Sequence, residues 1–106
     1  SPNPETLRQL LSNKHSSFAF YLSIRLIQKL KESAYELGYK KDTPCWVIEK
    51  ASWADEMVYK ADIETIEEKV SHIKGVALIL FGEFLHQQEL VESHLYAKQY
   101  KKERLR

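Results

Sequence analysis

The sequence is poor in the residue types that mark several classes of protein. It holds one cysteine and three glycines among 106 residues. The single cysteine, Cys45, excludes an internal disulfide and a multi-cysteine metal site, and it suits the reducing cytoplasm where we expect this protein to be found. Because Cys45 falls within a predicted strand, we expect a small buried hydrophobe there. With glycine only at Gly38, Gly75 and Gly82, the chain has no glycine-rich phosphate-binding loop.

The sequence also lacks an excess of either charge and any long apolar run. The formal net charge is +1, which does not call for a nucleic-acid or acidic-membrane partner. The longest apolar run, Val76 to Phe81, suits a buried strand and is far shorter than the roughly 20 residues of a membrane-spanning helix. Hydrophobic residues make up 43% and charged residues 29%, as in ordinary globular proteins. The length fits one domain that buries a core without disulfides or metals.

The spacing of apolar residues predicts helices that alternate with strands. Helices are expected over residues 5–12, 24–37, 63–73 and 87–97, and strands over residues 18–22, 45–50, 57–60 and 76–81. Ser23 and Asp62 are placed to cap the second and third helices, and Gly38 and Gly75 to end them. This alternation is typical of a layered α/β/α domain with a mixed, largely parallel sheet, which is the fold class we predict.

Three of the predicted strand ends are candidate ligand sites. In open α/β sheets, ligands lie beyond the carboxyl ends of the strands. Residues 22–23, 51–53 and 82–83 each place a small residue at such an end. A small residue lets a ligand approach the backbone closely, but it equally suits an ordinary turn. The pattern alone therefore leaves both interpretations open.

Other polar residues point to chemistry less directly. The four histidines lack the spacing of metal ligands, and we expect them on the surface. Asp55 and Glu56 are adjacent carboxylates in a predicted loop, where they either perform acid–base chemistry or simply lie in solvent. The basic residues of the tail, 98–106, either hold a polycarboxylate or phosphate partner or form a solvated terminus.

The residues at the strand ends resemble one family, the tetrapyrrole methylases, and within it the precorrin-4 branch. Residues 17–23, Ser-Phe-Ala-Phe-Tyr-Leu-Ser, resemble its Thr-Met-x-x-Phe-Leu-Ser stretch. Residues 42–44, Asp-Thr-Pro, and 51–56, Ala-Ser-Trp-Ala-Asp-Glu, are similar to its Asp-Thr-Pro and Ala-Ser-Trp-Pro-Asp-Glu segments. Residues 77–82, Ala-Leu-Ile-Leu-Phe-Gly, resemble its Ala-Leu-Ile-Leu-Val-Gly. Ala54, Met57 and Ala61 depart from the family pattern, which has proline, lysine and glycine there.

The resemblance implies the C-terminal half of an S-adenosylmethionine-dependent methyltransferase of cobalamin biosynthesis. Residues 1–4 would then be a remnant of an interdomain linker, 5–97 the C-terminal domain and 98–106 a charged tail. The implied partners are the N-terminal half of the same enzyme, a corrinoid precursor as substrate and a second copy in a homodimer. The half present here would be inactive alone.

The resemblance also implies where the cofactor binds. S-adenosyl-L-methionine is expected between the two halves, against Leu22, Ala51, Leu80, Phe81 and Gly82. These positions coincide with the three strand ends. No metal is expected, and no catalytic residue is assigned. The alternatives are another branch of the same family, or a non-catalytic α/β module that binds a small ligand or helps a dimer to form.

Overall fold

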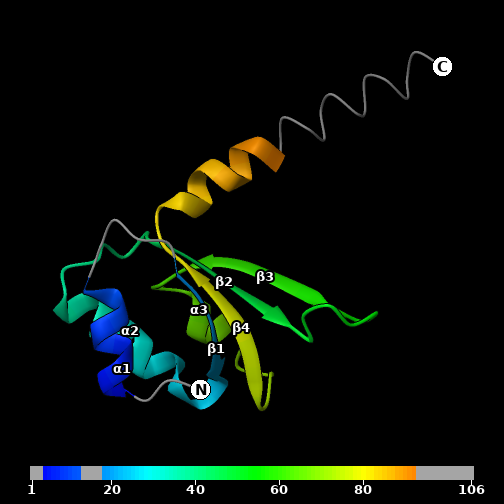
Figure 1. Cartoon of the computed structure of the whole chain (residues 1–106), viewed down its shortest axis with the longest axis horizontal. Helices are drawn as coiled ribbons and strands as arrows, with labels where there is room; N and C mark the ends of the chain where they lie inside the picture. Colours follow the sequence, from blue (N-terminus) through cyan, green and yellow to red (C-terminus); the bar gives the residue numbers. More distant parts are fainter. Residues whose placement is uncertain (1–3, 13–17, 93–106) are drawn as a thin grey trace.

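The strands of the computed structural model, which describes residues 4–12 and 18–92, form one antiparallel sheet. Its order is β1–β4–β2–β3 (Figure 1). The strands span Phe18–Ser23 (β1), Pro44–Glu49 (β2), Met57–Asp62 (β3) and Val76–Phe81 (β4). Every neighbouring pair runs antiparallel. The predicted α/β class is confirmed, and the expectation of a largely parallel sheet is wrong.

The connections explain why the strands are antiparallel. The helical segment after β1 leads to β2, and these two strands do run in the same direction, as a βαβ unit requires. However, β4 lies between them and runs against both. In the same way β3 and β4 share a direction, and β2 separates them. Two split βαβ arrangements therefore give helix–strand alternation in the sequence without parallel neighbours in the sheet.

Two of the four predicted helices are confirmed and two are placed differently. The chain forms α1 over Pro4–Leu11, and then a 3-10 turn, η1, over Ile24–Leu26, which continues as α2 over Ile27–Glu36. The expected helix over 63–73 is the single turn α3, Ile66–Lys69, with turns on both sides. The helix expected over 87–97 already begins at residue 84, and residues beyond 92 lie outside the described part.

The core lies on one face of the sheet, beneath the helices. Along β4, Ala77, Ile79 and Phe81 point into this core, and the residues between them point to the other face. The helices and turns contribute Leu11, Ile27, Leu30, Ala34, Ile63, Ile66, Val70 and Ile73. The last four are buried although only part of their segment is helical. Their 3–4 spacing indicates that one side of the segment is buried, and it does not require a continuous helix. Burial also raises the pKa of the Cys45 thiol, as expected for a small buried hydrophobe.

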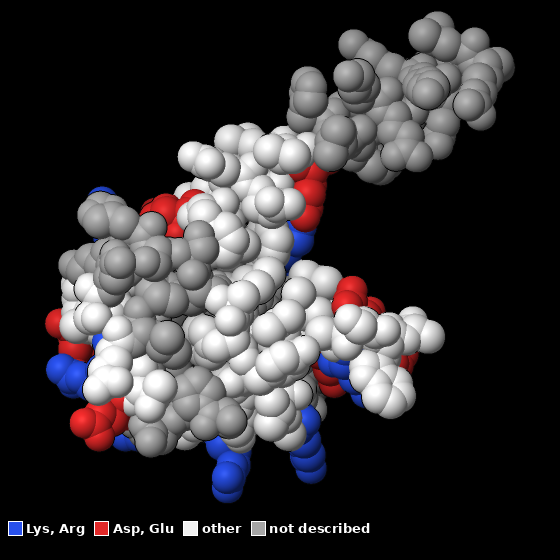
Figure 2. All heavy atoms as spheres, viewed as in Figure 1, with Lys and Arg blue, Asp and Glu red and all other residues white. Residues whose placement is uncertain are grey.

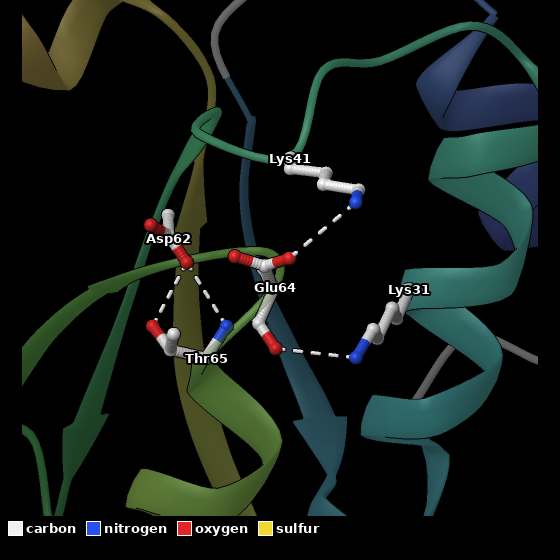
Figure 3. Close-up of polar contacts among 5 residues, drawn as sticks. All are labelled: Lys31, Lys41, Asp62, Glu64 and Thr65. Atoms are coloured by element: carbon white, nitrogen blue, oxygen red, sulfur yellow. Dashed lines mark hydrogen bonds and ion pairs between the residues drawn. The ribbon is translucent and has the colours of Figure 1, made fainter.

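Asp62, which was predicted to cap the third helix, instead holds the turn before α3, whose N-cap is Thr65. Asp62 Oδ1 accepts hydrogen bonds from the Thr65 backbone N–H at 2.9 Å and from Thr65 Oγ1 at 2.8 Å (Figure 3). Lys31 of α2 donates to the Glu64 carbonyl oxygen at 3.1 Å, which ties this turn to α2. Ser23, by contrast, occupies the N-cap position of η1 without a side-chain capping bond.

Replacing Asp62 with alanine is expected to lower the free energy of unfolding by about 1 kcal/mol, similar to the loss of a capping side chain, which accepts the same kind of backbone hydrogen bond. Two donors on Thr65 would lose their acceptor. Asp62→Asn keeps an acceptor oxygen and should lose clearly less. Urea denaturation of the wild type and both variants measures the difference. Equal losses for alanine and asparagine would show that the hydrogen bonds to Thr65 do not carry the effect.

Candidate functional site

Two of the three predicted strand ends lie at the same end of the sheet. Leu22 pairs with Ala77 near the start of β4, and Ala51 follows β2, which runs in the same direction as β1. The third strand end lies at the opposite end, because β4 runs against its neighbours. Ala77 and Phe81 are four residues apart, or about 13 Å at 3.3 Å per residue. Within this chain, the residues expected at the cofactor are therefore not gathered at one point.

The five expected cofactor residues also differ in exposure. Leu22 and Phe81 have no exposed surface, because their side chains belong to the core. Gly82 is buried as well, and its φ of 135° favours glycine. Only Ala51 and Leu80 are partly exposed. A ligand on the surface of this chain thus meets the side chains of Ala51 and Leu80, and the others only through backbone atoms.

The loop that joins β2 and β3, residues 50–56, is closed by its own polar groups and projects from the domain (Figure 1). The Trp53 N–H donates to the Lys50 carbonyl oxygen at 2.9 Å, and the Glu56 N–H donates to the Trp53 carbonyl oxygen at 3.0 Å. The Ser52 N–H donates to Glu56 Oε1 at 2.8 Å. These bonds hold Ala51 and Trp53 in one tight loop.

The adjacent carboxylates of this loop have structural partners. Lys50 Nζ donates to Asp55 Oδ2 at 2.8 Å. The pair raises the pKa of Lys50 and lowers the pKa of Asp55, so both groups stay charged near neutral pH. Glu56 accepts the bond from Ser52. This geometry favours an ordinary polar loop over acid–base chemistry by Asp55 and Glu56.

An apolar cavity of about 530 Å³, which the sequence had not revealed, lies on the sheet face opposite the core. Its lining is Trp46, Ile48, Val58, Lys60, Leu80, Phe84, Leu85, Gln88 and Glu92. Lys60 Nζ lies 4.4 Å from the centre of the Trp46 ring and 2.7 Å from Glu92 Oε2, so it links the sheet to helix 84–92. The only hint in the sequence was the alternation of Trp46 and Ile48, which face this side of β2.

A second polar cluster was not predicted from the sequence. The Tyr59 hydroxyl donates to Glu49 Oε1 at 3.3 Å and lies 3.0 Å from His72 Nε2. Burial and the nearby Glu49 raise the pKa of Tyr59, so its proton stays in place near neutral pH. Over residues 4–12 and 18–92, no group of three or more His, Cys, Asp and Glu side chains is arranged to hold a metal ion. In the same part of the chain, no helix has both the length and the apolar character needed to cross a membrane.

The fold of this chain is similar to part of a cobalamin biosynthetic enzyme of known structure. A solved structure of a cobalamin biosynthetic enzyme, cobalt precorrin-4 methyltransferase, superimposes with a TM-score of 0.65 and 30% identity, over 77% of this chain and 35% of that one. No family model matches the sequence.

Two relatives of known name are similar to this chain over nearly all of its length. The cobalt-precorrin-4 C(11)-methyltransferase of Methanocaldococcus jannaschii is 36% identical over 104 residues, 96% of this chain. The precorrin-4 C(11)-methyltransferase of a Sinorhizobium species is 35% identical over 103 residues. The chain is thus similar over nearly all its length to the (cobalt-)precorrin-4 C(11)-methyltransferases, and it spans about 40% of the length of each.

Proposed function

We propose that this chain forms the C-terminal part of an S-adenosylmethionine-dependent methyltransferase that acts on C11 of precorrin-4 or cobalt-precorrin-4. The observation that carries the proposal is the 36% identity over 104 residues to the enzyme of that name. The Ala-Ser-Trp and Asp-Glu residues of loop 50–56, which select this branch by resemblance, form one closed structural unit.

The end of the sheet that carries Ala51 fits the cofactor better than the end that carries Leu80 and Phe81. Ala51 is small, partly exposed and held in the closed loop 50–56, so a ligand can lie against it. At the opposite end, the Phe81 side chain is committed to the core, and Leu80 offers an apolar edge beside the cavity under helix 84–92. The five residues do not enclose a site by themselves, so the proposal includes further walls from the rest of the enzyme.

The proposed chemistry asks little of side-chain catalysis in this part. The bound cofactor would supply an already activated methyl group on a sulfonium. The protein then contributes mainly by aligning two ligands and excluding water. In this scheme Leu22, Ala51, Leu80, Phe81 and Gly82 form one side of the cofactor site. The matched segment is 40% of each relative, which leaves about 60% for the other side of the cleft. A homodimer remains part of the proposal.

The full-length protein tests this function directly. Incubated with S-adenosylmethionine and either precorrin-4 or cobalt-precorrin-4, it should add one methyl group, which mass spectrometry detects and NMR assigns to C11. Parallel incubations with uroporphyrinogen III and with precorrin-3 separate the other branches of the family. Methylation of one of these in place of precorrin-4 would overturn the assignment.

A bulky side chain at residue 51 is expected to weaken cofactor binding. In the full-length enzyme, Ala51→Trp should raise the Kd for S-adenosylmethionine at least tenfold, about 1.4 kcal/mol, because an indole fills the proposed contact space. Ala54→Trp makes the same change at an exposed position of the same loop and should alter the Kd little. Calorimetric titration measures both. A folded Ala51→Trp enzyme with an unchanged Kd would remove Ala51 from the site.

A further inference from the structure

Trp53 is the most exposed of the large hydrophobic side chains whose burial the structure describes. Its exposed fraction is 73%, whereas the other tryptophan, Trp46, is 4% exposed. A tryptophan is usually mostly buried, because its large apolar surface is costly to hydrate. Met57 and Val58, which follow the loop on β3, are also exposed, at 52% and 43%. The projecting hairpin therefore carries apolar surface that the described part of the chain leaves open.

The loop that carries Trp53 is strained and held in one shape. Lys50 and Ser52 have positive φ angles of 54° and 72°, values that residues other than glycine seldom adopt. The backbone bonds across the loop and the Ser52–Glu56 bond keep it in this conformation. Strained, over-determined loops are concentrated at ligand-binding sites, where they fix a side chain before the ligand arrives. Trp53 is the central residue of this loop, which spans residues 50–56.

The charges around Trp53 show which part of a ligand it can hold. Glu49, Lys50, Asp55 and Glu56 together carry a formal charge of −2, and the one cation among them is paired with Asp55. The loop thus offers no attractive position for a carboxylate. What it does offer is the flat, apolar face of an indole. This surface matches the uncharged face of a planar ring system whose acidic groups point elsewhere.

We propose that Trp53 stacks on the face of the tetrapyrrole macrocycle and holds the reacting ring carbon toward the cofactor side of loop 50–56. This inference rests on the proposed function, and it assigns a substrate-contacting residue to it. Ala51 and Trp53 lie two positions apart in one closed loop, so a macrocycle on Trp53 lies beside the cofactor contact expected at Ala51. Preorganisation of the loop lowers the entropy lost when the substrate binds.

Kinetics of the full-length enzyme test the assignment. Trp53→Ala should raise the KM for precorrin-4 about tenfold, the size expected for loss of one aromatic stack, and leave the Kd for S-adenosylmethionine within about twofold. Trp53→Phe keeps an aromatic ring and should recover most of the loss. Leu90→Ala is the matched control, because Leu90 is 71% exposed and belongs to helix 84–92, not to the loop.

Other outcomes overturn the assignment. An unchanged KM in Trp53→Ala removes Trp53 from the substrate site. A lower melting temperature or a changed oligomeric state, with the KM unaltered, shows instead that Trp53 packs against protein. If the wild-type enzyme does not methylate precorrin-4, the proposed function itself has failed, and the kinetics no longer report on Trp53.

A binding measurement on the 106-residue chain tests the stacking contact even if the enzyme does not methylate precorrin-4. Uroporphyrin III, a planar tetrapyrrole, should quench the fluorescence of the wild-type chain strongly and that of Trp53→Phe weakly. The variant retains only the buried Trp46, so the difference between the two titrations isolates Trp53. Equal quenching in both chains would overturn the stacking contact independently of any enzymatic activity.

Discussion

The Phe81→Ala variant is expected to unfold with a free energy about 3–5 kcal/mol below that of the wild type. Phe81 ends β4 between β1 and β2, and it has no exposed surface. Its ring meets the Tyr39 ring edge-on, with centroids 5.0 Å apart and an interplanar angle of 62°. Alanine would lose the transfer free energy of the ring, leave a cavity and remove this aromatic pair.

The same substitution series can show whether the loss comes from burial. Val76→Ala, at the other end of β4, changes a residue that is 55% exposed and should cost less than about 1 kcal/mol. Urea denaturation followed by circular dichroism measures both. The Tyr39 hydroxyl donates to the Leu11 carbonyl oxygen at 2.8 Å, so Phe81→Ala should also loosen α1 in hydrogen exchange. Similar losses for the two variants would contradict the placement of Phe81 in the core.

The sequence was most informative where burial follows a simple period. The apolar runs at 18–22, 45–50 and 76–81 all form strands, with their ends within about two residues. The 3–4 spacing of Ile63, Ile66, Val70 and Ile73 correctly identified four core residues but overstated the helix. Side-chain spacing records which side is buried. It does not record whether turns, here at residues 63–65 and 70–72, replace the helix between these residues.

Strand direction was the part that the sequence did not determine. The insertion of β4 between β1 and β2 depends on tertiary packing, not on any local signal. Ligands gather at the carboxyl ends of strands where neighbouring strands are parallel. Because the neighbours here are antiparallel, only Leu22 and Ala51 of the predicted residues lie at a common end of the sheet. The cavity beneath helix 84–92 was missed for a related reason. It requires Trp46, Lys60 and Glu92, from three elements, to meet.

The large apolar residues near the strand ends differ in exposure. Leu22, Trp53 and Phe84 lie at or close to the three predicted strand ends. Leu22 is fully buried against the core, Phe84 is partly buried, and Trp53 is open. The row formed by Tyr21, Leu78, Ile48 and Val58 crosses the sheet on its second face. Residues other than Lys, Arg, Asp and Glu cover much of the middle of Figure 2. Apolar surface is thus spread over the sheet as well as at its ends.

Incubation of the 106-residue chain alone with S-adenosylmethionine and precorrin-4 is expected to yield no methylated product. Leu22 and Ala51 lie at one end of the sheet and Leu80 at the other, and neither Leu22 nor Ala51 lines the cavity beside Leu80. Methyl transfer requires both ligands to be held in line and water to be excluded. A chain that supplies one wall of a cleft, as proposed, satisfies neither condition.

The measurement needs a positive control and a rescue. Full-length enzyme in the same buffer should give product at a rate that mass spectrometry resolves easily. Adding the remaining segment of the enzyme in trans should restore some turnover, and it should raise the melting temperature of the 106-residue chain, because a partner that binds only the native state stabilises it. Turnover by the chain alone, above a control without protein, would show that the described strands and loops contain a complete site. The proposal that Leu22, Ala51 and Leu80 form only one side of the cofactor cleft would then have to be abandoned.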